Sequence, residues 1–297
     1  MLIINDKPGQ LGNQLWSYAP FIAYCLKHDI TFLTLYFEDN YKFFDNLNKF
    51  EDIKFGLIKR RRADILLRKI LLKSVRHIPD FFLRRWKIFV DKKNWKNESW
   101  DEKVFLNNSN LVFIGVATHK KNNSYLKEYH QQLKEIFRPK ELFIANAEKI
   151  IDSARKKFDT IIGIHIRRGD YKKFLNGVYY FEDEIYKSYM CKILAERELH
   201  NKKIGFLLCS NEKINTNNFT PFNIFQIPNS CHISDLYALS LCDYLIGPPS
   251  TFSMWSSFYG EVPLRFIKYA NENLFLSEFN VIIAQDLFEN GTVLNHI

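Results

Sequence analysis

Two arginines and an aspartate stand together where an apolar run of the chain ends. Residues 161–166 are almost wholly apolar, with His165 as the interruption, and Arg167, Arg168 and Asp170 follow directly. Such a run is typical of a strand buried on both faces of a parallel sheet. Guanidinium groups bind phosphate oxygens through paired hydrogen bonds and keep their charge. The segment predicts an anion site at the carboxyl end of a strand, where ligands of open α/β sheets bind.

Asp170 admits two chemical roles beside these arginines. Its carboxylate can fix the orientation of a guanidinium group, or it can serve as a general base. The alternative for the whole cluster is a structural Arg–Asp pair that caps the strand. Because Gly169 interrupts the cluster at the strand end, we favour the ligand site.

A second segment, 247–255, joins a short apolar strand to a helix through a Gly-Pro-Pro turn. Ser250 is placed to cap the helix, and the free N–H groups of a helix N-terminus attract anions. Ser250, Thr251 and Ser253 are predicted to reach a phosphate, and plain capping is the alternative. Gly260 is expected to end the helix.

A third segment, 9–14, lies between the first predicted strand and the first predicted helix. Glycines at Gly9 and Gly12 allow close backbone approach to a ligand. Asn13 and Gln14 present amide groups at the helix start. The segment lacks the glycine spacing of a dinucleotide site and the Gly-Lys-Ser/Thr of a phosphate-binding loop, so alone it indicates little.

Hydrophobic periodicity indicates the elements that must position these segments. Strands are predicted at residues 2–4, 30–36, 111–117, 160–166, 204–209, 244–246 and 264–267. Helices are predicted at residues 15–26, 125–137, 141–158, 182–197, 234–241 and 251–259, the first of them kinked at Pro20. Strands that alternate with helices indicate an α/β protein with parallel sheets. A chain of 297 residues suggests two domains, placed at 1–150 and 151–297.

Composition excludes several classes of protein. The five cysteines are an odd number without a CxxC pair, so neither a zinc ribbon nor a disulfide scaffold is expected, and the thiols are taken as reduced in a cytoplasmic protein. The apolar start of the chain is too short for a signal peptide, and no stretch approaches a spanning helix.

The charge of the chain is concentrated in one segment. Residues 59–93 hold thirteen lysines and arginines against three acids, within a chain whose net charge is +9. Apolar residues interleave with these charges, which is typical of a basic amphipathic helix at an anionic membrane surface. A helix packed by its apolar side, with a solvated basic face, is the alternative. No motif supports nucleic-acid binding.

The three segments, taken in order, resemble the α-1,2-fucosyltransferase family, glycosyltransferase family 11, and its wider fucosyltransferase superfamily. Residues 9–19, GQLGNQLWSYA, resemble the family's N-terminal GxxGNQ motif, and 165–171, HIRRGDY, match its HxRRGDY signature. Residues 250–255, STFSMW, resemble its S-[ST]-F-S-W-W motif, and the helix from Asp235 resembles the element before it. Residues 40–150 carry no usable resemblance.

The resemblance implies a GT-B fold, an α/β architecture of two Rossmann-like domains facing across a cleft. The N-terminal domain would carry the acceptor side and the basic insertion, and the C-terminal domain would bind a nucleotide sugar, GDP-fucose in most members. It implies an inverting reaction without an obligatory metal or other cofactor. Arg167 would hold the β-phosphate. His165 and Asp235 would lie near the nucleoside, Ser250, Thr251 and Ser253 near the diphosphate, and Asn13 near the donor sugar.

Two departures from the family pattern fall in the donor segments. Gly247-Pro-Pro replaces the usual Ala/Ser-Asn, and Met254 replaces a tryptophan. Transfer of another deoxyhexose or hexose therefore stays open, as does a non-catalytic basic surface-binding protein. Asp170 competes with Asp6, Glu182 and Asp183 as general base. The expected partners are a nucleotide sugar, a glycan acceptor that is free or lipid-linked, and the inner face of an anionic membrane through 59–93.

Overall fold

The computed structural model describes residues 1–4, 8–34, 36–47, 49–56, 70, 74, 77–91, 111–114, 123–284, 288–289 and 292–293. Its contacts divide the chain into two units, Met1–Arg138 and Pro139–Ile297. This division lies earlier than the boundary drawn at residue 150, which falls inside helix α7, Glu141–Arg155. Helix α7 contacts helix α9, His232–Leu239, and for that reason groups with the second unit.

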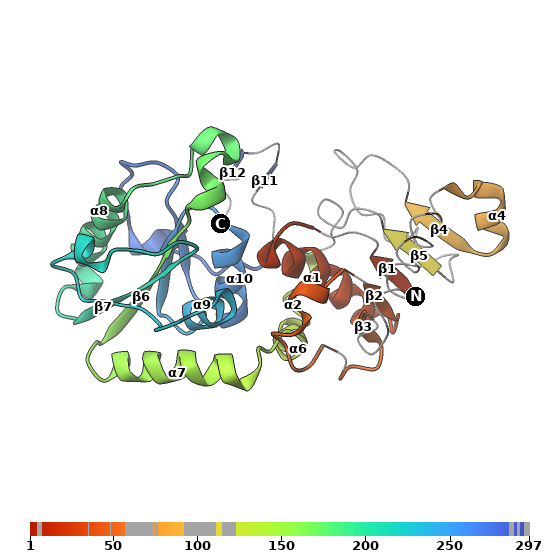
Figure 1. The fold of residues 1–297 in the computed structure, drawn as a ribbon, viewed down its shortest axis with the longest axis horizontal. Helices are drawn as coiled ribbons and strands as arrows, with labels where there is room; N and C mark the ends of the chain where they lie inside the picture. The colour runs from red at the N-terminus through yellow and green to blue at the C-terminus, as the bar shows by residue number, and fades with distance from the viewer. Residues whose placement is uncertain are drawn as a thin grey trace. The chain divides into compact units, whose positions relative to one another are not determined.

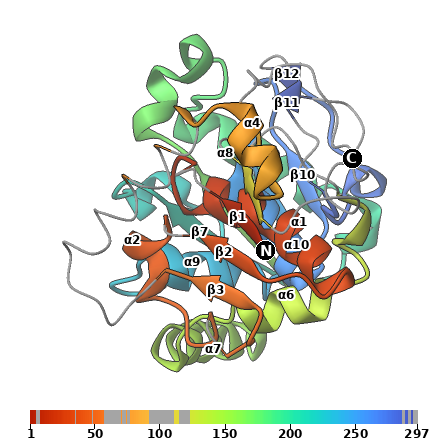
Figure 2. The same ribbon diagram turned by 90° about the vertical axis from the view of Figure 1, so that its right-hand side faces the viewer.

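A parallel sheet forms the centre of the first unit. The described strands follow the order β3-β2-β1-β5-β4, and Figure 2 shows β3, β2 and β1 side by side. These strands are β1 Leu2–Ile4, β2 Phe32–Thr34, β3 Ile53–Phe55, β4 Ile88–Asp91 and β5 Leu111–Ile114. The helices are α1 Leu11–Lys27, α2 Glu38–Tyr41, α4 Asp80–Arg85 and α6 His130–Ile136.

Aromatic side chains fill the core of this unit beside α1. The ring of Tyr18 meets Phe32, Phe37 and Phe55 edge-on at 5.8 to 6.4 Å between centroids. Phe137, just after α6, meets Phe55 at 5.6 Å. Large rings in edge-to-face contact stabilise the unit through burial and quadrupole attraction.

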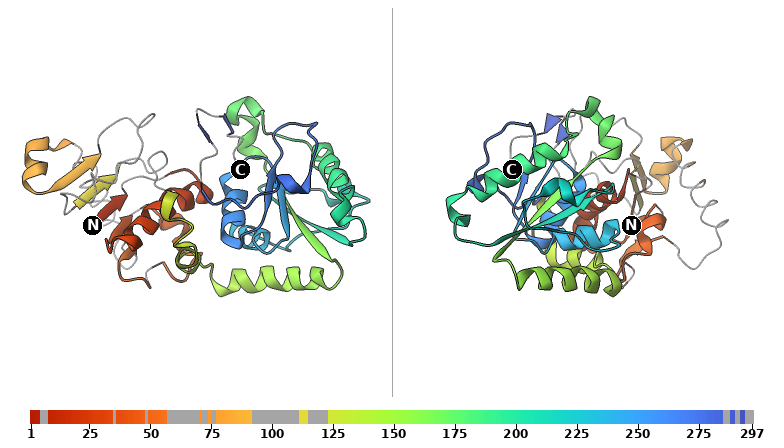
Figure 3. Two further views of the ribbon diagram at one scale, coloured as in Figure 1. Left: turned by 180° about the vertical axis from the view of Figure 1, so that it is seen from behind. Right: turned by 60° about the vertical axis from the view of Figure 1, so that its left-hand side comes forward.

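The second unit is a doubly covered parallel sheet in the order β10-β9-β6-β7-β8. Figure 1 shows α8 on one side of this sheet and α9 with α10 on the other, and Figure 3 shows the same two sides from behind. The strands are β6 Thr160–Ile166, β7 Ile204–Ser210, β8 Ile224–Phe225, β9 Tyr244–Gly247 and β10 Leu264–Phe266. The remaining elements are helices α8 Asp183–Leu194 and α10 Thr251–Gly260, and the hairpin β11 Phe288–Glu289 with β12 Thr292–Val293.

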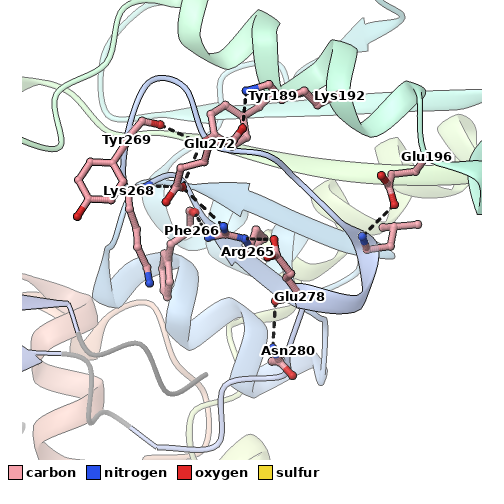
Figure 4. A network of polar contacts seen from close by, with 11 residues as sticks. Tyr189, Lys192, Glu196, Arg265, Phe266, Lys268, Tyr269, Glu272, Glu278 and Asn280 are labelled. Atoms are coloured by element: carbon pink, nitrogen blue, oxygen red, sulfur yellow. Dashed lines mark hydrogen bonds and ion pairs between the residues drawn. The ribbon is translucent and has the colours of Figure 1, made fainter.

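An ion cluster ties the chain after β10 to α8. Figure 4 shows Glu272 between Tyr189, Lys268 and Arg265. The Tyr189 hydroxyl donates to the Tyr269 carbonyl at 2.8 Å with a Glu272 oxygen 3.2 Å away, and Arg265 lies 3.6 Å from the same carboxylate. Arg265 Nε also donates to Glu278 at 3.0 Å. A side chain with five donors can hold several acceptors at once, and Arg265 thereby fixes the course of this segment.

The predicted strands and helices agree best with the structure in the second unit. Strand β6 has the predicted bounds, 160–166, and all seven of its residues are buried. The helix predicted at 125–137 is wrong at its start, because α6 begins at His130 and residues 123–125 form a single 3-10 turn. Strands β3, β4 and β8, of three, four and two residues, lie outside the predicted strands.

Helix α10 ends at Gly260, as expected, but the glycine is not the left-handed residue of the cap. Gly260 is the last residue of α10, and the left-handed residue that ends the helix is Glu261, with φ of 55°. A Cβ atom on Gly260 would overlap the carbonyl of Ser240, the residue that caps the C-terminus of α9. The glycine is therefore required by the close approach of two helices.

Candidate active site

Strands β6 and β9 end side by side and bring two of the predicted segments together. Ile164 pairs with Ile246 in the parallel register, so His165 stands beside Gly247 at the carboxyl edge of the sheet. A Cβ atom on Gly247 would lie 2.6 Å from the carbonyl oxygen of His165. The glycine at this departure from the family pattern thus lets the two strand ends lie in contact.

Arg167 lies immediately beyond the end of β6 with its side chain only 13% exposed. Both carboxylate oxygens of Asp170 lie 2.8 Å from its Nη2 atom. The guanidinium also lies over the ring of Tyr171, 5.2 Å from the centroid. A carboxylate and an aromatic face fix a guanidinium group in one orientation, which is what a preformed anion site requires.

Tyr171 connects Arg167 to the turn before α10. Its hydroxyl donates to the carbonyl oxygen of Pro249 at 2.6 Å, and its ring stacks on Phe174 at 5.1 Å. Sequence reasoning assigned Tyr171 no role, although it is the last residue of the HxRRGDY motif. Hydrogen bonding across 78 residues of chain is invisible without the fold.

Ser250 and Ser253 are both buried at the N-terminus of α10. The Ser250 hydroxyl accepts a hydrogen bond from the Phe252 N–H at 3.3 Å, as a capping residue does. The Ser253 hydroxyl donates to the Ser250 carbonyl at 3.2 Å and is fully buried. Thr251 between them is half-buried. The helix start nearest Arg167 is thereby rigid, and Thr251 is the hydroxyl with the most solvent access.

His165 is buried beneath this turn. Its ring lies 5.1 Å from the ring of Phe252, and within the part of the chain that the structure describes Nδ1 has no hydrogen-bond partner. Burial, assisted by the charge of Arg167, lowers the pKa of His165 to about 3. The imidazole is therefore neutral at pH 7, with one ring nitrogen as donor and the other as acceptor.

Asp235 lies in α9, behind the neighbouring strand β7. Its backbone carbonyl accepts a hydrogen bond from the Cys209 thiol at 4.0 Å, and Cys209 pairs with His165 in the β6–β7 register. Burial raises the pKa of the Asp235 carboxyl to about 6, against hydrogen bonds from Ser230 and Cys209 that lower it. Because burial disfavours the charged form, the ionised carboxylate gains more from a hydrogen-bond donor than an exposed carboxylate does.

Arg168 is engaged on the other side of β6. Its guanidinium is ion-paired with Asp183 at the start of α8, and Asn218 donates to the second oxygen of that carboxylate at 2.6 Å. The backbone N–H and carbonyl of Arg168 are both bonded to the amide of Asn211, which follows β7. Asp183 is only 12% exposed. These bonds tie the loop after β6 to its neighbours.

The remaining candidates lie elsewhere. Glu182 is exposed and precedes α8, and Asp6 lies outside the described residues. Gly9, Gly12, Asn13 and Gln14 all lie in the first unit, around the start of α1. Gln14 is buried, donates to the Gly9 carbonyl at 3.1 Å and accepts from Asn40 at 2.9 Å. Gln14 thereby shapes the glycine loop from within.

The described residues contain no group of three or more His, Cys, Asp or Glu side chains suited to a metal ion. Nor do they include a helix long and apolar enough to cross a membrane. All five cysteines, each of them in a described range, are free thiols. Most of the basic segment 59–93 lies outside the described residues.

The second unit thus combines a parallel sheet with an arginine and a helix N-terminus beyond the carboxyl ends of its strands, where ligands of open α/β sheets bind. The sequence model of "Glycosyl transferase family 11" matches residues 58–291, and the chain belongs to this family. The protein is thus a glycosyltransferase. A search of curated protein sequences finds no match.

Fucosyltransferase structures share this fold at low sequence identity. A mutant of Arabidopsis thaliana FUT1 in complex with GDP matches with a TM-score of 0.57 and 13% identity over 92% of this chain and 70% of that one. POFUT1 in complex with GDP matches with a TM-score of 0.53 and 9% identity, over 89% of this chain and 97% of that one. Fucosyltransferase NodZ from Bradyrhizobium matches with a TM-score of 0.52 and 14% identity, over 90% of this chain and 94% of that one. The predicted α/β class of GT-B type is confirmed.

Proposed function

We propose that this glycosyltransferase moves L-fucose from GDP-fucose to a hydroxyl of a glycan, with inversion at the anomeric carbon. The observation that carries the proposal is the fixed position of Arg167 beside the capped N-terminus of α10, linked through Tyr171 and Pro249. Family membership supplies the reaction class. GDP is the nucleotide held by the similar FUT1 and POFUT1 structures, which supports the same donor here.

Arg167 is proposed to stabilise the leaving group. Cleavage of the bond to GDP leaves negative charge on the β-phosphate, and a guanidinium that is already oriented stabilises that charge without reorganisation. The N–H groups at the start of α10 and the Thr251 hydroxyl supply further donors. Ser250 contributes by capping, and Ser253 by holding the backbone of the cap. On this scheme the protein needs no metal to neutralise the diphosphate.

Asp170 is proposed to serve the reaction through Arg167. Because both of its oxygens face Nη2, the carboxylate holds the guanidinium in place. Its side chain is 55% exposed, which leaves it accessible to an acceptor hydroxyl as the base. Asp183 is tied to Arg168 and Asn218, so it is the weaker candidate. Exposed Glu182 is the rival within this unit.

The nucleoside is proposed to bind beside His165 at the end of β6 and Asp235 of α9. Guanine presents an exocyclic amino donor, which an ionised carboxylate accepts well. Asp235 offers such a carboxylate and neutral His165 offers a ring nitrogen with no protein partner among the described residues. Arg168 is given a supporting role in this scheme, since its side chain is engaged by Asp183. The acceptor-side domain is proposed to bind substrate through Gly9, Gly12, Asn13 and Gln14.

A second candidate is transfer of another deoxyhexose or hexose from its nucleotide. The Gly247-Pro-Pro turn supports it, because this departure lies directly beside His165 and Ser250. Met254 supports it less, since the side chain is fully buried within the unit. A role in surface polysaccharide synthesis fits either donor.

A donor screen by thermal unfolding tests the proposal. GDP and GDP-fucose are expected to raise the melting temperature, since a ligand that binds the folded state stabilises it by RT ln(1 + [L]/Kd). GDP-mannose, UDP-sugars and dTDP-sugars serve as comparisons. A larger shift with a UDP- or dTDP-sugar would overturn the guanine assignment, and an equal shift with GDP-mannose would favour the second candidate.

A further inference from the structure

Three aromatic side chains of the first unit face solvent together. Phe81, Phe82 and Trp86, in and just after α4, are 72%, 48% and 56% exposed. The rings of Phe81 and Phe82 lie 5.6 Å apart, and Phe82 lies 6.3 Å from Trp86. Large apolar side chains that gather on one face of a protein mark an interaction surface more often than scattered ones do. We call these three residues the aromatic face.

The orientation of α4 shows that this face is not the side packed on the protein. Leu83, in the same helix, is 2% exposed and is the residue that anchors it inward. Phe82 and Trp86 are four residues apart, and so are Phe81 and Arg85, so both pairs lie on common sides of the helix. Leu83 therefore marks the side of the helix that packs on the protein, and the three exposed rings lie outside that side.

Positive charge surrounds the aromatic face in the sequence. Arg85 and Lys87 are exposed beside it, and both belong to the segment 59–93 with thirteen basic residues and three acids. Aromatic rings favour the boundary between lipid headgroups and acyl chains, and basic side chains are attracted to anionic headgroups. Either feature alone binds a bilayer weakly, whereas the two together give stable association.

We propose that the aromatic face inserts into the surface of a phospholipid bilayer that carries anionic headgroups. The positive charge complements anionic headgroups, and the contiguous apolar rings match the boundary with the acyl chains. Single-stranded nucleic acid would also satisfy the charge, yet it stacks bases on separate ring faces. Here Phe81 and Phe82 present their rings edge to face against each other, at an interplanar angle of 75°. Binding of the bilayer by the aromatic face does not depend on which donor the enzyme uses.

Vesicle flotation with the full chain tests this surface. The wild-type protein is expected to bind vesicles of phosphatidylcholine with phosphatidylglycerol, and to bind pure phosphatidylcholine vesicles far more weakly. The triple variant F81A/F82A/W86A is expected to lose affinity by on the order of tenfold or more, because it removes the inserted apolar groups. The variant R85E/K87E is expected to lose affinity mainly at low salt, since salt screens charge.

A matched control uses exposed aromatic residues of the second unit. Tyr269 and Phe275 are 66% and 51% exposed, and Y269A/F275A is expected to bind vesicles as the wild type does. Unchanged melting curves for all variants exclude misfolding. Equal loss in the control, unaltered binding by the triple variant, or no binding by the wild type would each overturn the proposal. So would tighter binding to a single-stranded RNA, or self-association that the triple variant abolishes.

Discussion

The hydroxyl of Tyr171 donates a 2.6 Å hydrogen bond to the carbonyl oxygen of Pro249, and this bond joins the loop after β6 to the turn before α10. Arg167 lies on the ring of the same tyrosine. One side chain therefore holds a cation and a helix N-terminus at one edge of the sheet. Since both groups are proposed to act on the diphosphate, their relative position should matter to donor binding.

Tyr171→Phe is expected to weaken GDP binding severalfold and to lower stability by about 1 to 2 kcal/mol, because the buried Pro249 carbonyl loses its partner. Calorimetric titration with GDP and a melting curve measure the two effects. Tyr189→Phe is the matched control, since its hydroxyl also donates to a backbone carbonyl, that of Tyr269 at 2.8 Å. Equal loss of GDP affinity in both variants would argue against the role of Tyr171.

Arg167→Ala and Arg168→Ala should separate function from stability. Arg167→Ala is expected to reduce kcat/KM by roughly 100- to 1,000-fold while the protein stays folded, as loss of a transition-state donor does. Arg168→Ala is expected to destabilise the fold by on the order of 3 kcal/mol, because it leaves the Asp183 carboxylate buried without its cation. Turnover assays and melting curves distinguish them. Near-normal turnover of Arg167→Ala would refute the proposed mechanism.

Asp170→Asn tests whether the carboxylate only orients Arg167. If it does, the amide oxygen keeps one hydrogen bond to Nη2 and kcat should fall by about tenfold or less. If Asp170 is the base, kcat should fall by roughly 100-fold or more, with GDP affinity kept. Glu182→Gln is the companion variant, since Glu182 is the exposed rival. A large loss in Glu182→Gln alone would move the base to that residue.

The buried carboxyl of Asp235 should make the free energy of unfolding depend on pH. Its pKa of about 6 in the folded state exceeds the unfolded value of 3.8, so the folded state holds the proton more tightly between these values. Stability from this group falls as pH rises from about 4 to 6, by roughly 3 kcal/mol in all. Asp235→Asn should remove that fall, and urea unfolding at pH 4, 5, 6 and 7 measures it.

The contribution of His165 to stability should change with pH in the opposite direction to that of Asp235. Its pKa of about 3 in the folded state lies below 6.5, so the unfolded chain gains a proton first as pH falls. Stability from His165 is complete above pH 6.5 and is lost toward pH 3. As pH falls, the free energy of unfolding of Asp235→Asn should therefore decrease more steeply than that of the wild type. That of His165→Gln should decrease less steeply. Identical pH profiles for all three proteins would contradict both shifts.

The sequence by itself determined the elements that carry strong local patterns. The apolar run 161–166 predicted a strand buried on both faces, and β6 has the predicted bounds, 160–166. Ser250 was identified as a cap because capping chemistry is local, and its hydroxyl accepts from Phe252 as expected. The motif HIRRGDY indicated the family, since so specific a string reflects shared descent and needs no fold to be seen.

Only the tertiary structure shows which groups each of the two adjacent arginines contacts. Arg167 and Arg168 are alike in type, yet one lies on Tyr171 and the other pairs with Asp183, fifteen residues away. Successive residues beyond a strand point to opposite sides, and which side meets which neighbour depends on how β7, β9 and α8 pack around β6. The same holds for Gly260, whose contact is a helix reached through the fold. Long-range packing, which no local pattern encodes, divides the roles at this sheet edge.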